Sequence, residues 1–126
     1  AGIPTDEIYL SLAEALVRNN KLAEGAGVLN KLLLRRWRTG QYTPVTFTES
    51  AIALGRVIQE RKKSLILRNL TWMDLKRLNR ETAFARTLVR KINGAMYELK
   101  PKDLRDAFLI PLTVVGTTPS IIQNGR

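Results

Sequence analysis

The chain contains neither cysteine nor histidine. Cysteine forms disulfides and acts as a thiol nucleophile, and histidine is the commonest general base in enzymes. Zinc sites are built mainly from the same two residue types, so nearly every zinc site is excluded as well. The sequence also lacks a glycine-rich loop that would cradle phosphate. We therefore expect no metal ion, no cofactor and no enzymatic activity.

Negative charge is scarce, because 11 Asp and Glu residues face 21 Lys and Arg residues and leave a net charge of +10. Such a surplus permits binding to nucleic acid or to an acidic protein, and a basic helical module of that kind is our alternative hypothesis. A fragment of a larger protein can also be basic because its acidic part is missing. The net charge alone therefore does not identify the function of the chain.

Long hydrophobic runs are absent too, since none approaches the roughly 20 residues of a membrane span. We also expect no signal peptide within these residues. The apolar content of 44% in 126 residues is typical of one globular domain with a modest core. The chain opens on Ala1-Gly2 without Met. We expect residues 1–126 to form a single C-terminal domain of a longer protein whose N-terminal part is missing.

Two amphipathic helices are predicted between residues 6 and 37, with Thr5 or Asp6 as the N-cap and a break at Asn19-Asn20. The connection is short, so the helices should form an antiparallel hairpin. The spacing of small residues at the expected crossing matches a tetratricopeptide hairpin, although any two-helix hairpin could show it. One such hairpin leaves a face open, so an exposed apolar patch is expected. The small residues are Ala13 and Gly25, and the large apolar positions are Tyr9, Leu12 and Leu29.

A capping-box pattern formed by Thr46 and Glu49 predicts a long third helix over about 49–69. Its expected core contacts are Ile52, Ile58 and Leu65.

A short fourth helix is predicted over about 72–78, where Trp72 should belong to the core. Asn93-Gly94 is a turn signal that can join two short strands. The prolines after residue 100 predict an extended, irregular tail over about 101–126, lying on the helices. The fold class is therefore mainly α, with a tetratricopeptide-like hairpin, further helices and an irregular C-terminal tail.

Three segments of the chain resemble the SusD/RagB family of outer-membrane nutrient-binding lipoproteins. The first comprises YLSLAEA at 9–15, NNKLAE at 19–24 and LNKL at 29–32. The second joins IQER at 58–61 to WMDLKR at 72–77, and the third joins FLIP at 108–111 to TPSIIQN at 118–124. Each piece is unspecific alone, but all three occur in family order and cover nearly the whole chain.

The chain also departs from the family pattern. Where the family has Glu-Leu, Glu-Gly and Arg in the second segment, this chain has Ser64-Leu65, Arg68-Asn69 and Thr71. In the third segment, this chain has Leu109 where the family has its first Pro, and about Val114 where the family has Glu. The lost acidic residues put a shared salt-bridge network in doubt and indicate a divergent subfamily, for which a different ligand is an open alternative.

The resemblance implies a lipid-anchored protein on the surface of the outer membrane. It would capture nutrients, typically glycans, and deliver them to a TonB-dependent transporter of the SusC type. In the family, the tetratricopeptide-like helices form the scaffold and contact the transporter, while ligand specificity lies elsewhere. We therefore expect this chain to supply scaffold and partner contact.

Four charged residues of the second segment are expected to form structural ion pairs, Glu60 with Arg77 or Lys76 and Arg61 with Asp74. A buried carboxylate needs a partner, and Asp74 lies between two apolar residues. The alternative, a pair of carboxylates for acid-base chemistry, has no supporting base or metal ligand.

Trp37 and Tyr42 are the candidate ligand-binding residues, because an exposed aromatic in the loop near Gly40 could stack on a sugar ring. The competing interpretation is that Trp37 covers the core of the hairpin while the arginines around it are solvated.

Overall fold

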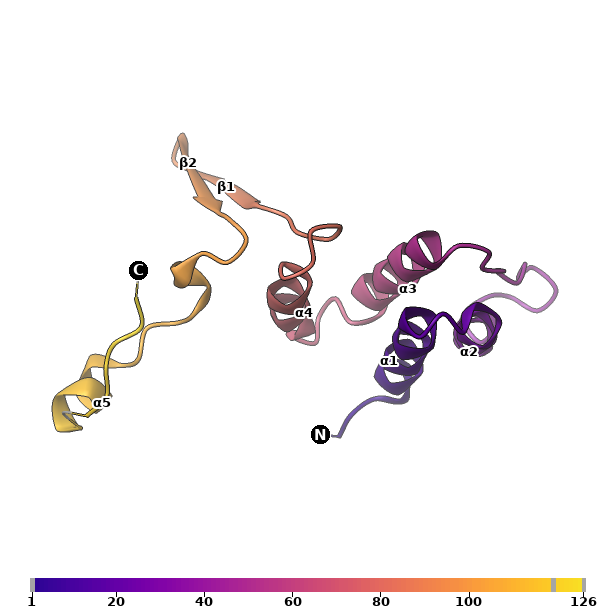
Figure 1. Ribbon diagram of the computed structural model, residues 1–126, viewed down its shortest axis with the longest axis horizontal. Helices are drawn as coiled ribbons and strands as arrows, with labels where there is room; N and C mark the ends of the chain where they lie inside the picture. The colour runs from indigo at the N-terminus through magenta and orange to yellow at the C-terminus, as the bar shows by residue number, and fades with distance from the viewer. Residues whose placement is uncertain (1, 119, 126) are drawn as a thin grey trace. The chain divides into compact units, whose positions relative to one another are not determined.

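A computed structural model of the chain describes residues 2–118 and 120–125. It confirms a mainly helical fold, with one two-stranded sheet among the described residues. The chain divides into two compact units, which are called here the helical unit (Ala1–Thr71) and the C-terminal unit (Trp72–Arg126). Figure 1 shows the order of the elements along the chain.

The helical unit contains α1 (Thr5–Arg18), α2 (Leu22–Leu34) and α3 (Ser50–Ser64). Helix α1 packs against both α2 and α3, and the three helices lie together in Figure 1. Their common core is closed by side chains from all three, so no helix buries its apolar face alone. The fully or almost fully buried members are Leu10, Ala13, Val17, Leu29, Leu33, Ala53 and Val57.

The hairpin of α1 and α2 crosses closely at its small residues, as the sequence predicts. A methyl group added to Gly25 would lie 2.8 Å from Cγ2 of Val17 and 3.4 Å from the carbonyl oxygen of Ala13. The turn between the helices uses Asn20, whose φ of 59° is the left-handed conformation that ends helices. Of the residues expected on the inner face of α1, Ala13 is buried but Leu12 is 48% exposed.

Two predicted ends of the hairpin helices need correction. The hairpin ends at Leu34 and not at residue 37, because residues 35–37 form a turn and a bend. Helix α1 begins at Thr5 after Pro4, so neither Thr5 nor Asp6 is its N-cap. Pro4 is the N-cap, and its side chain has no acceptor for the first N–H groups of the helix.

The third helix is shorter at both ends than predicted, spanning Ser50–Ser64 in place of 49–69. Its N-cap is Glu49 and no side chain caps it, so the expected capping box of Thr46 and Glu49 does not form. Ile58 and Leu65 are buried as expected, whereas Ile52 is 66% exposed. The buried face of α3 passes through Ala53 and Val57, one position away from Ile52 on the helix.

The C-terminal unit contains most of α4 (Leu70–Leu78), strands β1 (Leu88–Ile92) and β2 (Ala95–Leu99), the 3-10 turn η1 (Leu104–Asp106) and α5 (Leu112–Thr117). Helix α4 starts two residues earlier than the predicted 72–78. Asn69, with a φ of 58°, ends the preceding turn and fixes that start. The predicted irregular tail over 101–126 is therefore interrupted by η1 and α5, and its Pro119 lies outside the described residues.

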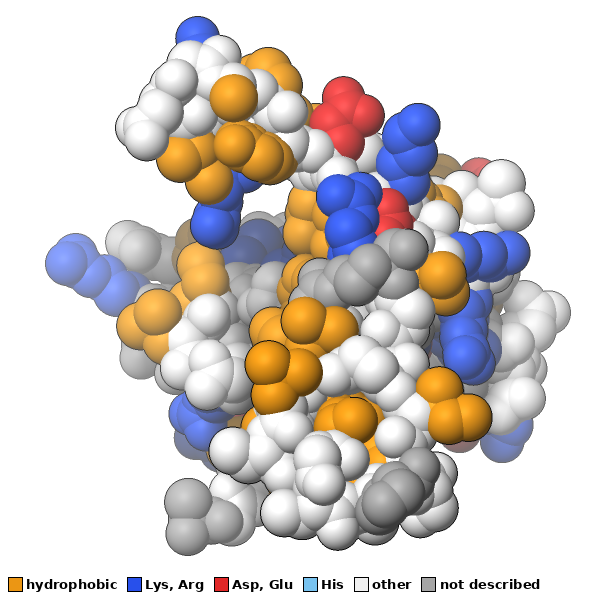
Figure 2. Space-filling model, turned by 90° about the vertical axis from the view of Figure 1, so that its left-hand side faces the viewer, with side chains coloured by type: hydrophobic (Ala, Val, Ile, Leu, Met, Phe, Trp, Pro, Cys, Tyr) orange, Lys and Arg blue, Asp and Glu red, His pale blue; other side chains and the backbone are white. Residues whose placement is uncertain are grey.

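Strands β1 and β2 pair antiparallel in a hairpin, with Ile92 opposite Ala95 across a two-residue turn. Asn93 and Gly94 both have positive φ, 49° and 85°, which is the geometry of the tight turn that their sequence predicts. None of the described residues after Leu78 is buried. Figure 2 shows hydrophobic side chains at the surface of the face that it presents, among scattered Lys and Arg side chains.

Candidate functional site

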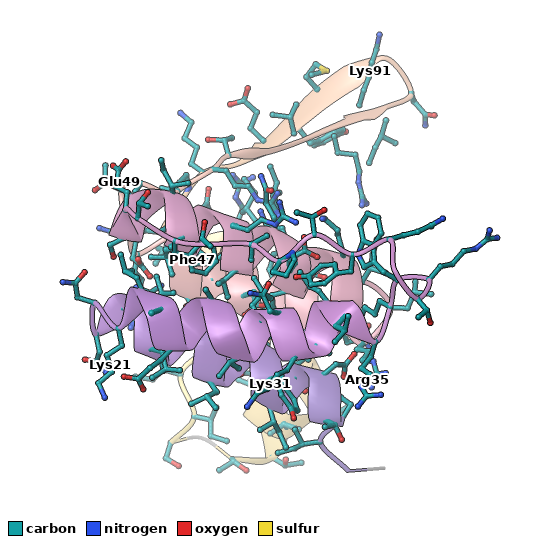
Figure 3. The ribbon with its side chains drawn as sticks, turned by 90° about the vertical axis from the view of Figure 1, so that its right-hand side faces the viewer. Lys21, Lys31, Arg35, Phe47, Glu49 and Lys91 are labelled. Atoms are coloured by element: carbon teal, nitrogen blue, oxygen red, sulfur yellow. The ribbon has the colours of Figure 1, made fainter. Side chains whose placement is uncertain are left out.

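The loop between α2 and α3 runs back along α2 from Arg35 to Glu49 (Figure 3). Its half-buried side chains Tyr42, Val45 and Phe47 pack against the core of the three helices. Apolar contacts alone would leave the backbone of such a loop poorly fixed, so its polar groups need partners.

Asn30 of α2 supplies those partners. Its Oδ1 accepts hydrogen bonds from the backbone N–H of Val45, at 2.9 Å, and from the hydroxyl of Tyr42. Its Nδ2 donates to the carbonyl oxygen of Val45, also at 2.9 Å. One half-buried amide thus fixes two points of the loop. The sequence contains Asn30 within the first family-like segment, but its side-chain role follows only from the loop's return along α2.

The candidate sugar-binding residues Trp37 and Tyr42 lie together in this loop, with ring centroids 6.1 Å apart and planes tilted by 49°. Tyr42 is held by Asn30, and burial raises the pKa of its hydroxyl, opposed by its hydrogen bond with Val45. Tyr42 therefore helps to hold the loop against α2. Trp37 is 56% exposed, so a ligand could reach it.

Glu60 is buried in α3 and paired with two cations of its own helix. Its carboxylate oxygen Oε1 lies 3.0 Å from Nε of Arg56 and 2.7 Å from Nζ of Lys63. Because a buried carboxylate without a partner is costly, two flanking cations explain how Glu60 is accommodated within an apolar face.

Arg61 is also buried, and it connects α3 to α1. Its Nη1 donates to the hydroxyl of Ser11 at 3.1 Å, and its Nη2 lies 3.8 Å from the carboxylate of Glu7. In α4, Asp74 pairs with Arg77 at 3.1 Å. The sequence predicted other pairs, namely Glu60 with Arg77 or Lys76 and Arg61 with Asp74. These pairs would join the two units, and they stay predictions.

A shallow groove of about 700 Å³ lies between the beginning of α1 and the end of α2. Its apolar part comes from Tyr9, Leu32 and Leu34. Its charged part comes from Lys31, Arg35 and the ion pair of Arg36 with Asp6. Figure 3 shows Lys31 along α2 and Arg35 at its C-terminal end. Within the described ranges neither of these two cations has an ion-pair partner. The groove therefore suits a ligand with both apolar groups and negative charge.

Two parts of the tail hold each other through side-chain amides. The amide of Gln123 accepts from the N–H of Ile110 and donates to the carbonyl oxygen of Ile110, both at 2.9 Å. Nδ2 of Asn124 donates to the carbonyl oxygen of Phe108 at 2.6 Å. We call these contacts the tail clasp. They join the FLIP and IIQN portions of the third family-like segment, which lie 13 or more residues apart in the sequence.

The tail also contacts α4 inside the C-terminal unit, as the sequence predicts for part of it. The rings of Trp72 and Phe108 have centroids 6.2 Å apart, and Nζ of Lys76 lies 3.9 Å from a carboxylate oxygen of Asp106. Trp72 is only half-buried, so the expectation that it is a core residue is corrected. Its ring lines a pocket that the sequence did not predict.

The part of the chain that the structure describes contains no group of three or more acidic side chains positioned to hold a metal ion. Among the same residues, no helix is long and apolar enough to span a membrane. No family model matches the sequence, and no curated protein or solved structure matches it either. The resemblance to the SusD/RagB family therefore depends on the residues of this chain alone.

Proposed function

We propose that the chain is the C-terminal part of a SusD/RagB-like lipoprotein that captures nutrients, typically glycans, on the surface of the outer membrane. The chain supplies scaffold and contact with a SusC-like TonB-dependent transporter, and the missing N-terminal part carries the lipid anchor and the main nutrient site. Three family-like segments support this proposal through their order along the chain.

The tail clasp is the observation that carries the proposal. Phe108, Ile110, Gln123 and Asn124 belong to the two separated halves of one family-like segment, and they form the hydrogen bonds of a single clasp. A shared structural role of the two halves would require that they contact each other, and they do. Their contact gives the matched residues a common structural role.

The helical unit supports the proposed partner contact. The outer side of α1 exposes Ile8 to 55% and Leu12 to 48%, which agrees with the open apolar face expected of a single hairpin. The groove beside Lys31 and Arg35 adds positive charge to this unit. An acidic, partly apolar segment of the transporter would satisfy both features.

A non-enzymatic role is part of the same proposal. Acid-base catalysis needs a carboxyl group positioned at a reacting atom. The buried carboxylates Glu14, Glu60 and Asp74 are instead each engaged by an arginine, namely Arg18, Arg56 and Arg77. Such pairs stabilise the charged carboxylate and serve the packing of their helices.

The test is co-purification from the cell that makes the natural protein. Outer membranes solubilised in mild detergent are passed over affinity-tagged natural protein, and bound partners are identified by mass spectrometry. We expect a large TonB-dependent transporter, and we expect the substitution of Lys31 and Arg35 by Glu to reduce its recovery. The charge-matched control is the double substitution of Lys62 and Arg68 by Glu, at two exposed positions outside the groove. Recovery of the protein in the cytosol without such a partner would overturn the proposal.

The alternative, a module that binds nucleic acid, has one observation in its favour. At least eight of the 11 carboxylates form ion pairs, so the surplus cations remain available to a polyanion. A gel-shift assay with duplex DNA and RNA, repeated at rising salt, separates the two functions. Binding that persists at physiological ionic strength would favour the alternative.

A further inference from the structure

A pocket of about 430 Å³ lies in the C-terminal unit, lined by the two strands, the first turn of α4 and η1. Its volume falls within the range of small-ligand sites. The groove of the helical unit and the Trp37 ring take no part in it. Its lining combines two aromatic rings, of Trp72 and Tyr97, with two guanidinium groups, of Arg90 and Arg105. Glu98 also lines it, and its carbonyl oxygen accepts a hydrogen bond from Arg105.

One face of the β-hairpin forms a wall of this pocket. Residues opposite each other in the hairpin share a face, so the pair Leu88 and Leu99 lies on the same side as the pair Arg90 and Tyr97. The two leucines are half-buried, whereas Tyr97 is 56% exposed. On this face of the hairpin, the ring of Tyr97 and the guanidinium of Arg90 are therefore exposed to solvent next to two half-buried leucines.

Trp72 supplies the second ring from α4. Its indole lies against the ring of Phe108, with centroids 6.2 Å apart and planes tilted by 35°. Phe108 therefore supports Trp72 from one side, and the half-buried indole lines the pocket. A supported ring loses little conformational entropy when a ligand stacks on it.

Arg105 supplies a guanidinium that is already fixed. Its Nε and Nη2 donate to the two carboxylate oxygens of Asp103, at 2.9 and 2.7 Å, and its Nη2 also donates to the carbonyl oxygen of Glu98. These contacts lower the pKa of Asp103 below its usual range. Asp103 neutralises Arg105, and within the described residues no carboxylate is paired with Arg90.

We propose that this pocket binds a sugar that carries a carboxylate, as in the hexuronate units of acidic glycans. The C–H groups on one face of the sugar ring lie against Tyr97 or Trp72, since aromatic faces carry partial negative charge. The carboxylate accepts two parallel hydrogen bonds from Arg90, a geometry that guanidinium favours. The choice of a sugar over another anionic ring compound rests on the proposed function.

The test uses the fluorescence of Trp72 in the full chain. Because the chain has two tryptophans, Trp37→Phe leaves Trp72 as the only indole. We expect titration with oligogalacturonate to change its emission, and Arg90→Gln to weaken the binding by about tenfold or more. Lys91→Gln removes the same charge from the opposite face of the hairpin and should leave the affinity within about twofold. Lys91 is labelled near the hairpin turn in Figure 3.

A second pair of variants tests the ring. Tyr97→Ala should weaken binding, whereas Met96→Ala, its neighbour on the other face, should not. Arg90→Lys, which keeps the charge but not the paired hydrogen bonds, should bind at an intermediate affinity. Circular dichroism of each variant identifies any loss of fold.

Three results would overturn the inference: no response to oligogalacturonate, equal affinity for a neutral oligoglucoside, or equal weakening by Arg90→Gln and Lys91→Gln. Tighter binding of a single-stranded oligonucleotide through Arg90 would assign the pocket to nucleic acid and overturn it as well. The co-purification of the transporter does not depend on this pocket, so the two proposals can fail separately.

Discussion

The two units of this chain are stabilised by different physical means. In the helical unit, three helices and a loop bury a continuous set of apolar side chains, among them Leu10, Leu29 and Val57 at 0% exposure. In the C-terminal unit, the buried side chains are confined to α4 among the described residues. The rest of that unit is held by hydrogen bonds between side chains and the backbone. The side chains are those of Asn79, Arg105, Gln123 and Asn124.

The contrast implies different stability and different roles. Burial of apolar area contributes about 25 cal/mol per Å² and is cooperative across a core. A hydrogen bond contributes a net of only about 1 kcal/mol, and it can open locally without unfolding its surroundings. We therefore expect the helical unit to unfold as one body, and the hairpin and tail to open more readily. A rigid scaffold and an adaptable binding region would follow from that division.

Leu29→Ala should have the largest effect. Leu29 is fully buried where all three helices meet, so its truncation should cost about 3 kcal/mol of unfolding free energy. Urea unfolding followed at 222 nm measures the change. Leu34→Ala removes the same atoms from a side chain that is 55% exposed, and should cost less than about 0.5 kcal/mol. Equal costs would show that the helical unit has no specific core.

Local patterns in the sequence predicted the helices and the hairpin turn, because those elements depend on neighbouring residues. Asn20 and Gly94 adopt the left-handed conformations that their positions require. The end of α3 was missed, since residues 65–69 are apolar or basic enough to continue a helix and the turn there has no glycine or proline. The exposure of Ile52 was not predicted, because the packing of α3 against neighbouring helices determines which of its faces is buried. The apolar periodicity of α3 alone does not determine that face.

The candidate site was less predictable than the fold. The pocket beside Trp72 joins a helix, two strands and a 3-10 turn, so its members are spread from residue 72 to residue 105. No spacing rule connects such residues. The strand pairing that places Arg90 beside Tyr97 could be derived from the Asn93-Gly94 turn by counting outward, but Arg105 follows only from the path of the tail.

Asn30→Ala tests the hydrogen bonds that fix the loop of the helical unit at Tyr42 and Val45. It removes the acceptor for Tyr42 and for the N–H of Val45, and the donor to the Val45 carbonyl. We expect a loss of about 2 kcal/mol, because half-buried backbone groups lose their partners. Denaturant unfolding measures it, with exposed Gln59→Ala in α3 as the control. A cost no larger than that of the control would mean that apolar packing alone holds the loop.

Gln123→Ala applies the corresponding change to the C-terminal unit. Both hydrogen bonds with Ile110 are lost, so the tail clasp should open at a cost of about 1 kcal/mol. Amide hydrogen exchange should accelerate over residues 108–124 while α1, α2 and α3 keep their protection. Ile122→Ala, at an 88% exposed position next to it, should leave exchange unchanged. Loss of protection in the helices would contradict the division between the units.

Two glycines of α2 allow the sharpest comparison within one helix, because their substitutions should have opposite signs. At Gly27 an added methyl group meets nothing within 4 Å, so Gly27→Ala should stabilise the helix by about 0.5–1 kcal/mol. At Gly25 the same methyl would lie 2.8 Å from Cγ2 of Val17, which is fully buried and stiff because its side chain is β-branched. The steric cost of about 1–3 kcal/mol should exceed the gain in helix propensity, so Gly25→Ala should destabilise. Thermal unfolding of the two variants gives the two signs directly. If both substitutions stabilised the chain, the close crossing of α1 and α2 would be refuted, and with it the structural basis for the tetratricopeptide-like hairpin.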